Sequence, residues 1–125
     1  MEQKKQITQP MLEDLERLLQ TPGIKIERKK GRLNFFDTEY TVVDDMGQEL
    51  LYLKREYHVR HVPIDAPDEA EFEYWHNIKF KGTEIVKDVV YTKGSEEFRN
   101  PRMRLYNKIF SSLNEKYTNT EKVAC

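Results

Sequence analysis

The chain is poor in the features that mark secreted, membrane and disulfide-linked proteins. Its single cysteine, Cys125, is the last of 125 residues, so no disulfide can form within the chain. No apolar run reaches the length needed to cross a membrane, and the first residues lack the apolar centre of a signal peptide. We therefore expect a cytoplasmic protein with no membrane partner.

The chain also has no excess of one charge. It contains 21 basic and 22 acidic residues, which gives a formal net charge of −1. Binding to nucleic acid or to a membrane surface therefore cannot be argued from the charge of the whole chain.

Residue patterns that carry catalysis or bind cofactors are missing as well. The five glycines are scattered singly, so there is no phosphate-binding loop, and no serine lies in a nucleophile motif. His58 and His61 are three positions apart, which on a strand places them on opposite faces and prevents them from sharing a metal ion. We expect no enzymatic activity, no cofactor and no metal site.

The residues that are present suffice for one folded core. The chain is 38% hydrophobic, 11% aromatic and 34% charged, and 125 residues is the size of one domain. We predict a single domain over residues 1–125, with disordered polar tails at 1–8 and 118–125.

Two amphipathic helices are predicted, one near each end of the chain. Apolar residues recur at helical spacing over residues 11–19, with Thr8 as the N-cap candidate. Asn100 and Pro101 are typical of an N-cap followed by a first-turn proline, and the apolar stripe after them runs to about Tyr117.

Between the helices the apolar period changes to two, which indicates strands. Runs rich in β-branched and aromatic residues occupy 24–28, 33–36, 40–43, 50–53, 57–62 and 71–81. The segment 44–47 has the composition of a hairpin turn that ends in a left-handed glycine. The sequence predicts an α+β fold, with an antiparallel sheet of five to seven strands in a meander flanked by an N-terminal and a C-terminal helix.

The segment 71–81 is the clearest strand and holds the only tryptophan, Trp75, in its polar register. A two-residue turn at Gly82 and Thr83 would place Trp75 opposite Val90 and Lys79 opposite Val86. Trp75, Val86 and Val90 would then form an apolar patch on the outer face of the sheet. Either a helix of the chain covers this patch or another molecule binds there.

Three functions are compatible with these features. The first is a protein-binding or self-associating module that uses the sheet face around Trp75, with another protein or a second copy as its partner. The second is binding of nucleic acid or a phosphate ligand by clustered basic residues. This set is Arg28, Lys29, Lys30, Arg32, Lys54, Arg55 and Arg60. The third is a small-ligand pocket between the sheet and the C-terminal helix, with His76 and Tyr74 at its rim.

Charge placement bears on the second function in two ways. Glu27, Glu56 and Asp37 lie among the basic residues, so these charge runs are also explained as solvated, paired surfaces. Three arginines open the second helix, where the helix dipole disfavours positive charge, and this conflict favours a role for them other than helix stability.

Overall fold

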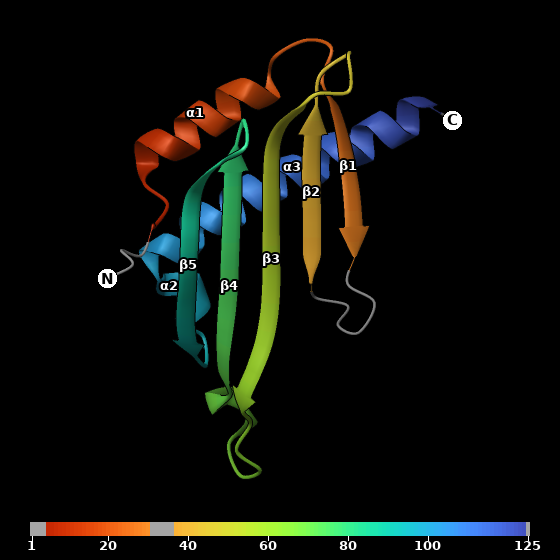
Figure 1. The fold of residues 1–125 in the computed structure, drawn as a ribbon. Helices are drawn as coiled ribbons and strands as arrows, with labels where there is room; N and C mark the ends of the chain where they lie inside the picture. Colours follow the sequence, from red (N-terminus) through yellow and green to blue (C-terminus); the bar gives the residue numbers. More distant parts are fainter. Residues whose placement is uncertain (1–4, 31–36, 125) are drawn as a thin grey trace.

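The computed structural model describes the backbone of residues 5–30 and 37–124, and their side chains except those of 30, 97, 98 and 119–124. The elements are α1 (Gln9–Leu19), β1 (Lys25–Lys30), β2 (Thr38–Val43), β3 (Glu49–His61), a 3₁₀ turn (Pro67–Glu69), β4 (Glu71–Phe80), β5 (Thr83–Lys93), α2 (Glu96–Arg99) and α3 (Pro101–Ala124). The strands form one antiparallel sheet in the order β1-β2-β3-β4-β5 (Figure 1). The predicted α+β meander with a helix at each end is confirmed, with five strands.

Both predicted helices begin at their expected caps. The Thr8 hydroxyl accepts a hydrogen bond from the backbone N–H of Met11 at 3.3 Å, and α1 follows. Asn100 Oδ1 accepts from the backbone N–H groups of Arg102 and Met103 at 2.9 and 3.2 Å, and α3 begins at Pro101. These side chains satisfy N–H groups that have no partner within the first turn of a helix.

The sheet has fewer and longer strands than the apolar runs suggest. The runs 50–53 and 57–62, predicted as separate strands, fall on the single strand β3, which ends at His61. The turn at 44–47 is confirmed, because Gly47 has a φ of 82° and its N–H donates to the Asp44 carbonyl at 3.1 Å. The predicted strand 33–36 lies outside the described residues.

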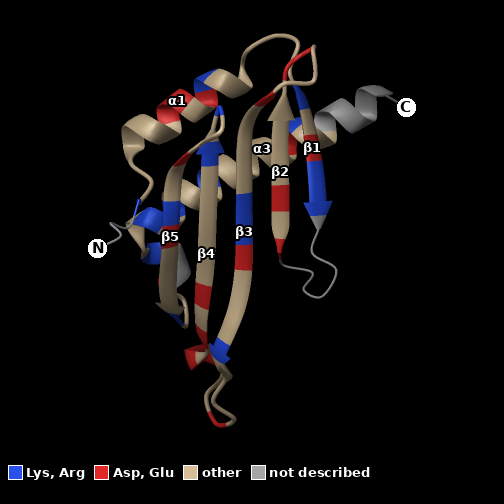
Figure 2. Ribbon diagram, viewed as in Figure 1, with Lys and Arg blue, Asp and Glu red and all other residues tan. Residues whose placement is uncertain are grey.

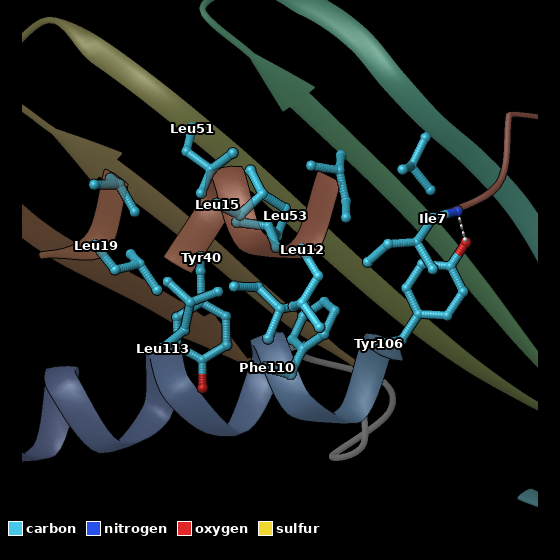
Figure 3. Close-up of a cluster of buried hydrophobic side chains, with 14 of the residues drawn as sticks. Ile7, Leu12, Leu15, Leu19, Tyr40, Leu51, Leu53, Tyr106, Phe110 and Leu113 are labelled. Atoms are coloured by element: carbon cyan, nitrogen blue, oxygen red, sulfur yellow. Dashed lines mark hydrogen bonds between the residues drawn. The ribbon is translucent and has the colours of Figure 1, made fainter. Parts of the chain in front are cut away.

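Helices α1 and α3 both pack on one face of the sheet, which we call the inner face (Figures 1 and 3). The buried apolar side chains there come from α1, from alternate positions of all five strands, and from α3. They include Leu12, Leu15, Leu19, Ile26, Val42, Leu51, Leu53, Ile78, Val86, Val90, Tyr106, Ile109 and Leu113. The opposite, outer face has neither helix on it.

Ordered structure extends into both segments that were predicted to be disordered. Ile7 is buried in the core, and its N–H donates to the Tyr106 hydroxyl at 3.2 Å (Figure 3). Lys5 pairs with Lys87 of β5 as an isolated antiparallel bridge. At the other end α3 continues to Ala124 rather than ending near Tyr117. The N-terminal segment is ordered because Ile7 packs against distant residues of the core. Its neighbours in sequence are polar and gave no sign of this.

The predicted register between β4 and β5 is wrong. The turn falls at Lys81 and Gly82, whose φ values of 50° and 83° are those of a type I′ hairpin turn. A turn one residue earlier would by itself shift the β5 partner of every β4 residue by two positions. The same β5 side chains would then stay on each face of the sheet. However, Ile78 pairs with Val86 and Lys79 with Glu84, so Ile85 is an extra, bulged residue.

The bulge exchanges the two faces of β5. Val86 and Val90 therefore lie opposite Ile78 and Tyr74 on the inner face, where both valines are fully buried. The predicted surface of Trp75, Val86 and Val90 does not exist, because the two valines lie on the other side of the sheet. The bulge lets β5 bury Val86 and also keep Ile85 packed against the edge of the core.

Candidate functional site

Three large exposed apolar side chains lie together on the outer face. Trp75 of β4 is opposite Val89 of β5, and Tyr91 lies two residues further along β5 on the same face. Their exposed fractions are 43%, 37% and 49%. We call Trp75, Val89 and Tyr91 the outer patch. The alternative explanation of Trp75, that one of the chain's helices covers it, is excluded for α1 and α3, which lie on the inner face.

The Trp75 ring is held in place by its neighbours. The His58 ring of β3 lies against it with 4.6 Å between ring centroids. The indole Nε1–H donates to Glu73 Oε2 at 3.1 Å, and the other Glu73 oxygen lies 2.9 Å from Arg60 Nε. Tyr91 donates its hydroxyl proton to Glu71. The patch is therefore an oriented aromatic surface rather than a set of loose side chains.

The seven predicted phosphate-binding residues do not share one surface. Lys29 and Lys54 are on the outer face, and Lys54 lies 3.7 Å from Glu39. Arg60 is paired with Glu73 as described above. The side chain of Lys30 and the whole of Arg32 lie outside the described residues.

The other two members of the set, Arg28 and Arg55, lie on the inner face. Arg28 Nη1 donates to Asn114 Oδ1 of α3 at 2.6 Å, and its guanidinium lies 4.7 Å from the centre of the Tyr117 ring. Arg55 Nη2 donates to Asn107 Oδ1 of α3 at 2.9 Å. Both arginines therefore join the sheet to α3.

The inner face contains a buried polar cluster that the sequence did not reveal. Asp88 is buried and accepts from Arg102 Nη1 at 2.8 and 2.9 Å and from the Tyr106 hydroxyl at 2.8 Å. Arg102 thus neutralises a buried carboxylate, which explains one of the three arginines at the start of the second helix. The sequence signals for this cluster are Asp88, an acid within an apolar strand, and the arginines that open the second helix.

His76 is buried beside this cluster rather than at the rim of a pocket. Its ring stacks on Tyr106 with 3.8 Å between centroids, and its Nε2 accepts from Arg55 Nε at 3.0 Å. Burial, followed by the charges of Arg55 and Arg102, holds the pKa of His76 well below its ordinary value. The ring is therefore neutral with its proton on Nδ1, which has no hydrogen-bond partner among the described residues.

Tyr106 also keeps its proton. Burial raises the pKa of its hydroxyl, and the adjacent Asp88 carboxylate acts in the same direction. Because Tyr106 donates to Asp88 and accepts from the N–H of Ile7, it links β5, α3 and the N-terminal segment. This cluster serves the packing of the two layers.

An apolar groove lies between α1 and the hairpin of β4 and β5. Its volume is about 490 Å³. The residues that line it are Met11, Asp14, Leu15, Arg17, Leu18, Thr21, Phe80 and Ile85. The predicted ligand pocket was placed at the C-terminal helix, whereas this groove is at the N-terminal helix.

Within the described ranges, no three His, Cys, Asp or Glu side chains gather as metal ligands, and no helix combines the length and apolarity needed to cross a membrane. No protein-family model, curated protein or solved structure matches the chain at a significant level, so the outer patch and the groove are interpreted from their own geometry.

Proposed function

We propose that this protein is a small protein-binding module that binds through the outer face of its sheet, centred on the outer patch. The observation that carries the proposal is the side-by-side position of Trp75, Val89 and Tyr91 on a face that neither α1 nor α3 covers. Apolar groups that adjoin one another on a surface mark interaction sites more often than single exposed residues do.

The residue types of the patch favour a protein partner. Trp and Tyr are enriched among the residues that contribute most to protein–protein binding, since each buries a large area when a partner covers it. The Trp75 ring is already oriented by His58 and by its bond to Glu73. A side chain that is ordered before binding loses less conformational entropy in the complex.

The surroundings of the patch also suit a protein rather than a nucleic acid. Charged residues of both signs lie along the strands around it (Figure 2). Glu71 and Glu73 lie on one side, and Lys87 and Lys93 lie on the strand beside them. A mixed polar rim around an apolar centre is usual in protein interfaces, whereas binding of a phosphate backbone needs cations that converge.

The test compares the wild type with Trp75→Ser. Self-association is measured by light scattering over a range of protein concentrations. Binding to other proteins is measured by capture from the host lysate, followed by titration of each purified candidate. We expect at least one saturable association that weakens about tenfold or more in Trp75→Ser, because a central aromatic residue typically contributes about 2 kcal/mol or more.

Ile64→Ser is the matched control. Ile64 is 98% exposed and lies in the loop between β3 and β4, away from the outer patch. This control variant is expected to associate like the wild type. If Trp75→Ser and Ile64→Ser behave identically in both measurements, the proposal is wrong.

The groove beside α1 favours a second candidate, binding of a small apolar molecule. Its volume of about 490 Å³ lies within the range of small-ligand sites, and Met11, Leu18 and Phe80 give it apolar walls. Native mass spectrometry of the protein isolated from its host is expected to show a retained small molecule. A mass equal to that of the polypeptide alone would count against this candidate.

A further inference from the structure

The apolar wall of the groove beside α1 follows the axis of the helix. Met11, Leu15 and Leu18 recur at helical spacing, so they form one stripe along α1. Met11 and Leu18 lie about 10 Å apart along the axis, since each helical residue rises by about 1.5 Å. Phe80 and Ile85 line the groove from the hairpin, and like Met11 and Leu18 they are only partly buried. The groove therefore offers uncovered apolar surface along a line, which fits an extended alkyl chain.

The charged residues that line the groove neutralise each other. Arg17 donates to Asp14, which lies one turn earlier in α1, and the two side chains are 72% and 66% exposed. Thr21 is the remaining lining residue with a polar side chain, and it is uncharged. The charge preference of the groove is therefore set by the residues at its edge.

Lys81 supplies positive charge at this edge. Its Nζ lies 5.5 Å from the centre of the Phe80 ring, which is part of the groove wall. Lys81 forms no ion pair with any residue that the structure describes. The acid nearest to it in the sequence, Glu84, instead accepts from Asn77 at 2.6 Å on the outer face. A cation without a partner beside an apolar groove favours a ligand that joins an anionic head to an apolar tail.

We infer that the groove binds a single-chain carboxylic acid, with the alkyl chain along the stripe of α1 and the carboxylate bound by Lys81. This inference rests on the second candidate function, ligand binding in the groove, and names the class of ligand. The chain would cover the exposed parts of Met11, Leu18, Phe80 and Ile85, which is the main source of affinity. The carboxylate would accept a charge-assisted hydrogen bond from the lysine.

The test uses decanoate and decan-1-ol, which have the same alkyl chain but differ in the charge of the head. NMR follows the methyl signals of Leu18 and Ile85 in the groove during each titration. We expect saturable shifts of both signals with decanoate. The methyl signals of Val89, on the outer face, are expected to stay in place and serve as the internal control.

Lys81→Gln tests the charge, because it removes the cation at an exposed turn position. We expect this variant to bind decanoate about threefold more weakly than the wild type and to bind decan-1-ol equally well. Added salt should weaken decanoate binding in the wild type more than in Lys81→Gln. Lys93→Gln is the matched control, because Lys93 is also exposed but lies at the other end of the hairpin, opposite Glu71. It is expected to bind both ligands like the wild type.

The length of the ligand tests the apolar wall. Hexanoate carries the same head on a shorter chain, and each methylene group that becomes buried contributes about fourfold to affinity. We therefore expect decanoate to bind at least about tenfold more tightly than hexanoate. Equal affinities for the two acids would overturn the placement of the chain along α1.

The outcomes separate this inference from the function on which it rests. If Lys81→Gln changes the binding of decanoate and decan-1-ol to the same extent, the groove is a site for apolar ligands and the carboxylic acid inference is wrong. If neither ligand shifts the signals of Leu18 and Ile85, the inference and the second candidate function both fail. Equal shifts at Val89 would indicate unspecific adsorption and would also overturn the inference. Binding to phosphatidylglycerol vesicles without binding of free decanoate would assign the groove to membrane lipid instead.

Discussion

Val89 and Val90 are the same residue type at consecutive positions, yet one belongs to the outer face and the other to the inner face. Val90 is fully buried under the helices, whereas Val89 is 37% exposed. The chemistry of a residue therefore does not decide its face. The bulge at Ile85 and the layer of helices on one side of the sheet decide it.

Charged groups show the same contrast between the faces. On the inner face, Asp88 is buried and has two partners that come from α3. On the outer face, Lys54 and Glu39 form a partly exposed pair 3.7 Å apart. Exposed pairs contribute little to stability, whereas a buried carboxylate that loses its partner is costly.

Asp88→Ala is expected to have the largest effect. It leaves the Arg102 guanidinium and the Tyr106 hydroxyl without their acceptor, and we expect a loss of about 3 kcal/mol in the free energy of unfolding. Asp45→Ala, in an exposed turn, is the control and should change it by less than about 0.5 kcal/mol. Urea unfolding measures both variants. Equal values for the two would show that the inner cluster is not needed for stability.

Val90→Ala and Val89→Ala compare the two faces of the sheet most directly. Removing two buried methyl groups at Val90 should cost about 2 kcal/mol, whereas the change at Val89 should stay within about 0.5 kcal/mol. The comparison also tests the register of β5. The reverse order of effects would support the register with Val90 opposite Trp75 and overturn the bulge at Ile85.

His76 should make stability depend on pH. Its pKa in the folded protein lies well below that of an unfolded chain, so protons bind preferentially to the unfolded state as the pH falls. Stability should be greatest above about pH 7 and decrease below it, by at most about 1.4 kcal/mol per pH unit. Urea unfolding at pH 7.5, 6.5 and 5.5 measures this slope.

His76→Gln is the matched variant, because the glutamine side-chain oxygen can still accept a hydrogen bond from Arg55 but does not titrate. The difference between wild type and His76→Gln isolates this residue from the other titrating groups. Identical slopes for the two proteins would show that His76 is protonated equally well in the folded and unfolded states.

Tyr91→Ser should have the smallest effect on stability. The ring is about half exposed, and its bond to Glu71 lies on the surface, so we expect a change within about 0.5 kcal/mol. Association, in contrast, should weaken clearly. A loss of stability above 2 kcal/mol would mean that Tyr91 contributes to folding rather than to binding.

Local sequence signals were sufficient for the elements and for several of their ends. Thr8 and Asn100 mark helix starts because their side chains satisfy nearby backbone donors, and Gly47 marks a turn because it adopts positive φ readily. The alternation of 71–81 likewise predicted β4 and the position of Trp75 on its outer face. These features depend on neighbours a few residues away.

The candidate site was only half predictable. Trp75 was placed correctly on the outer face of the sheet, but its neighbours on β5 were not. The only mark of the bulge at Ile85 in the sequence is that the predicted register would put Lys87 on the core face. The pairing of Asp88 with Arg102 and of Arg55 with His76 joins residues 14 and 21 positions apart. No local pattern connects such positions.

The sequence alone was enough to define an α+β meander with a helix at each end. Its signals were helix caps, turn residues and the alternation of apolar side chains, which depend on short-range hydrogen bonding and periodicity. The fold in three dimensions was needed to place both helices on the same face, to turn Val86 and Val90 inward and to leave Trp75, Val89 and Tyr91 outside. The physical reason is that burial depends on what packs against a side chain, and the packing partners come from distant parts of the chain.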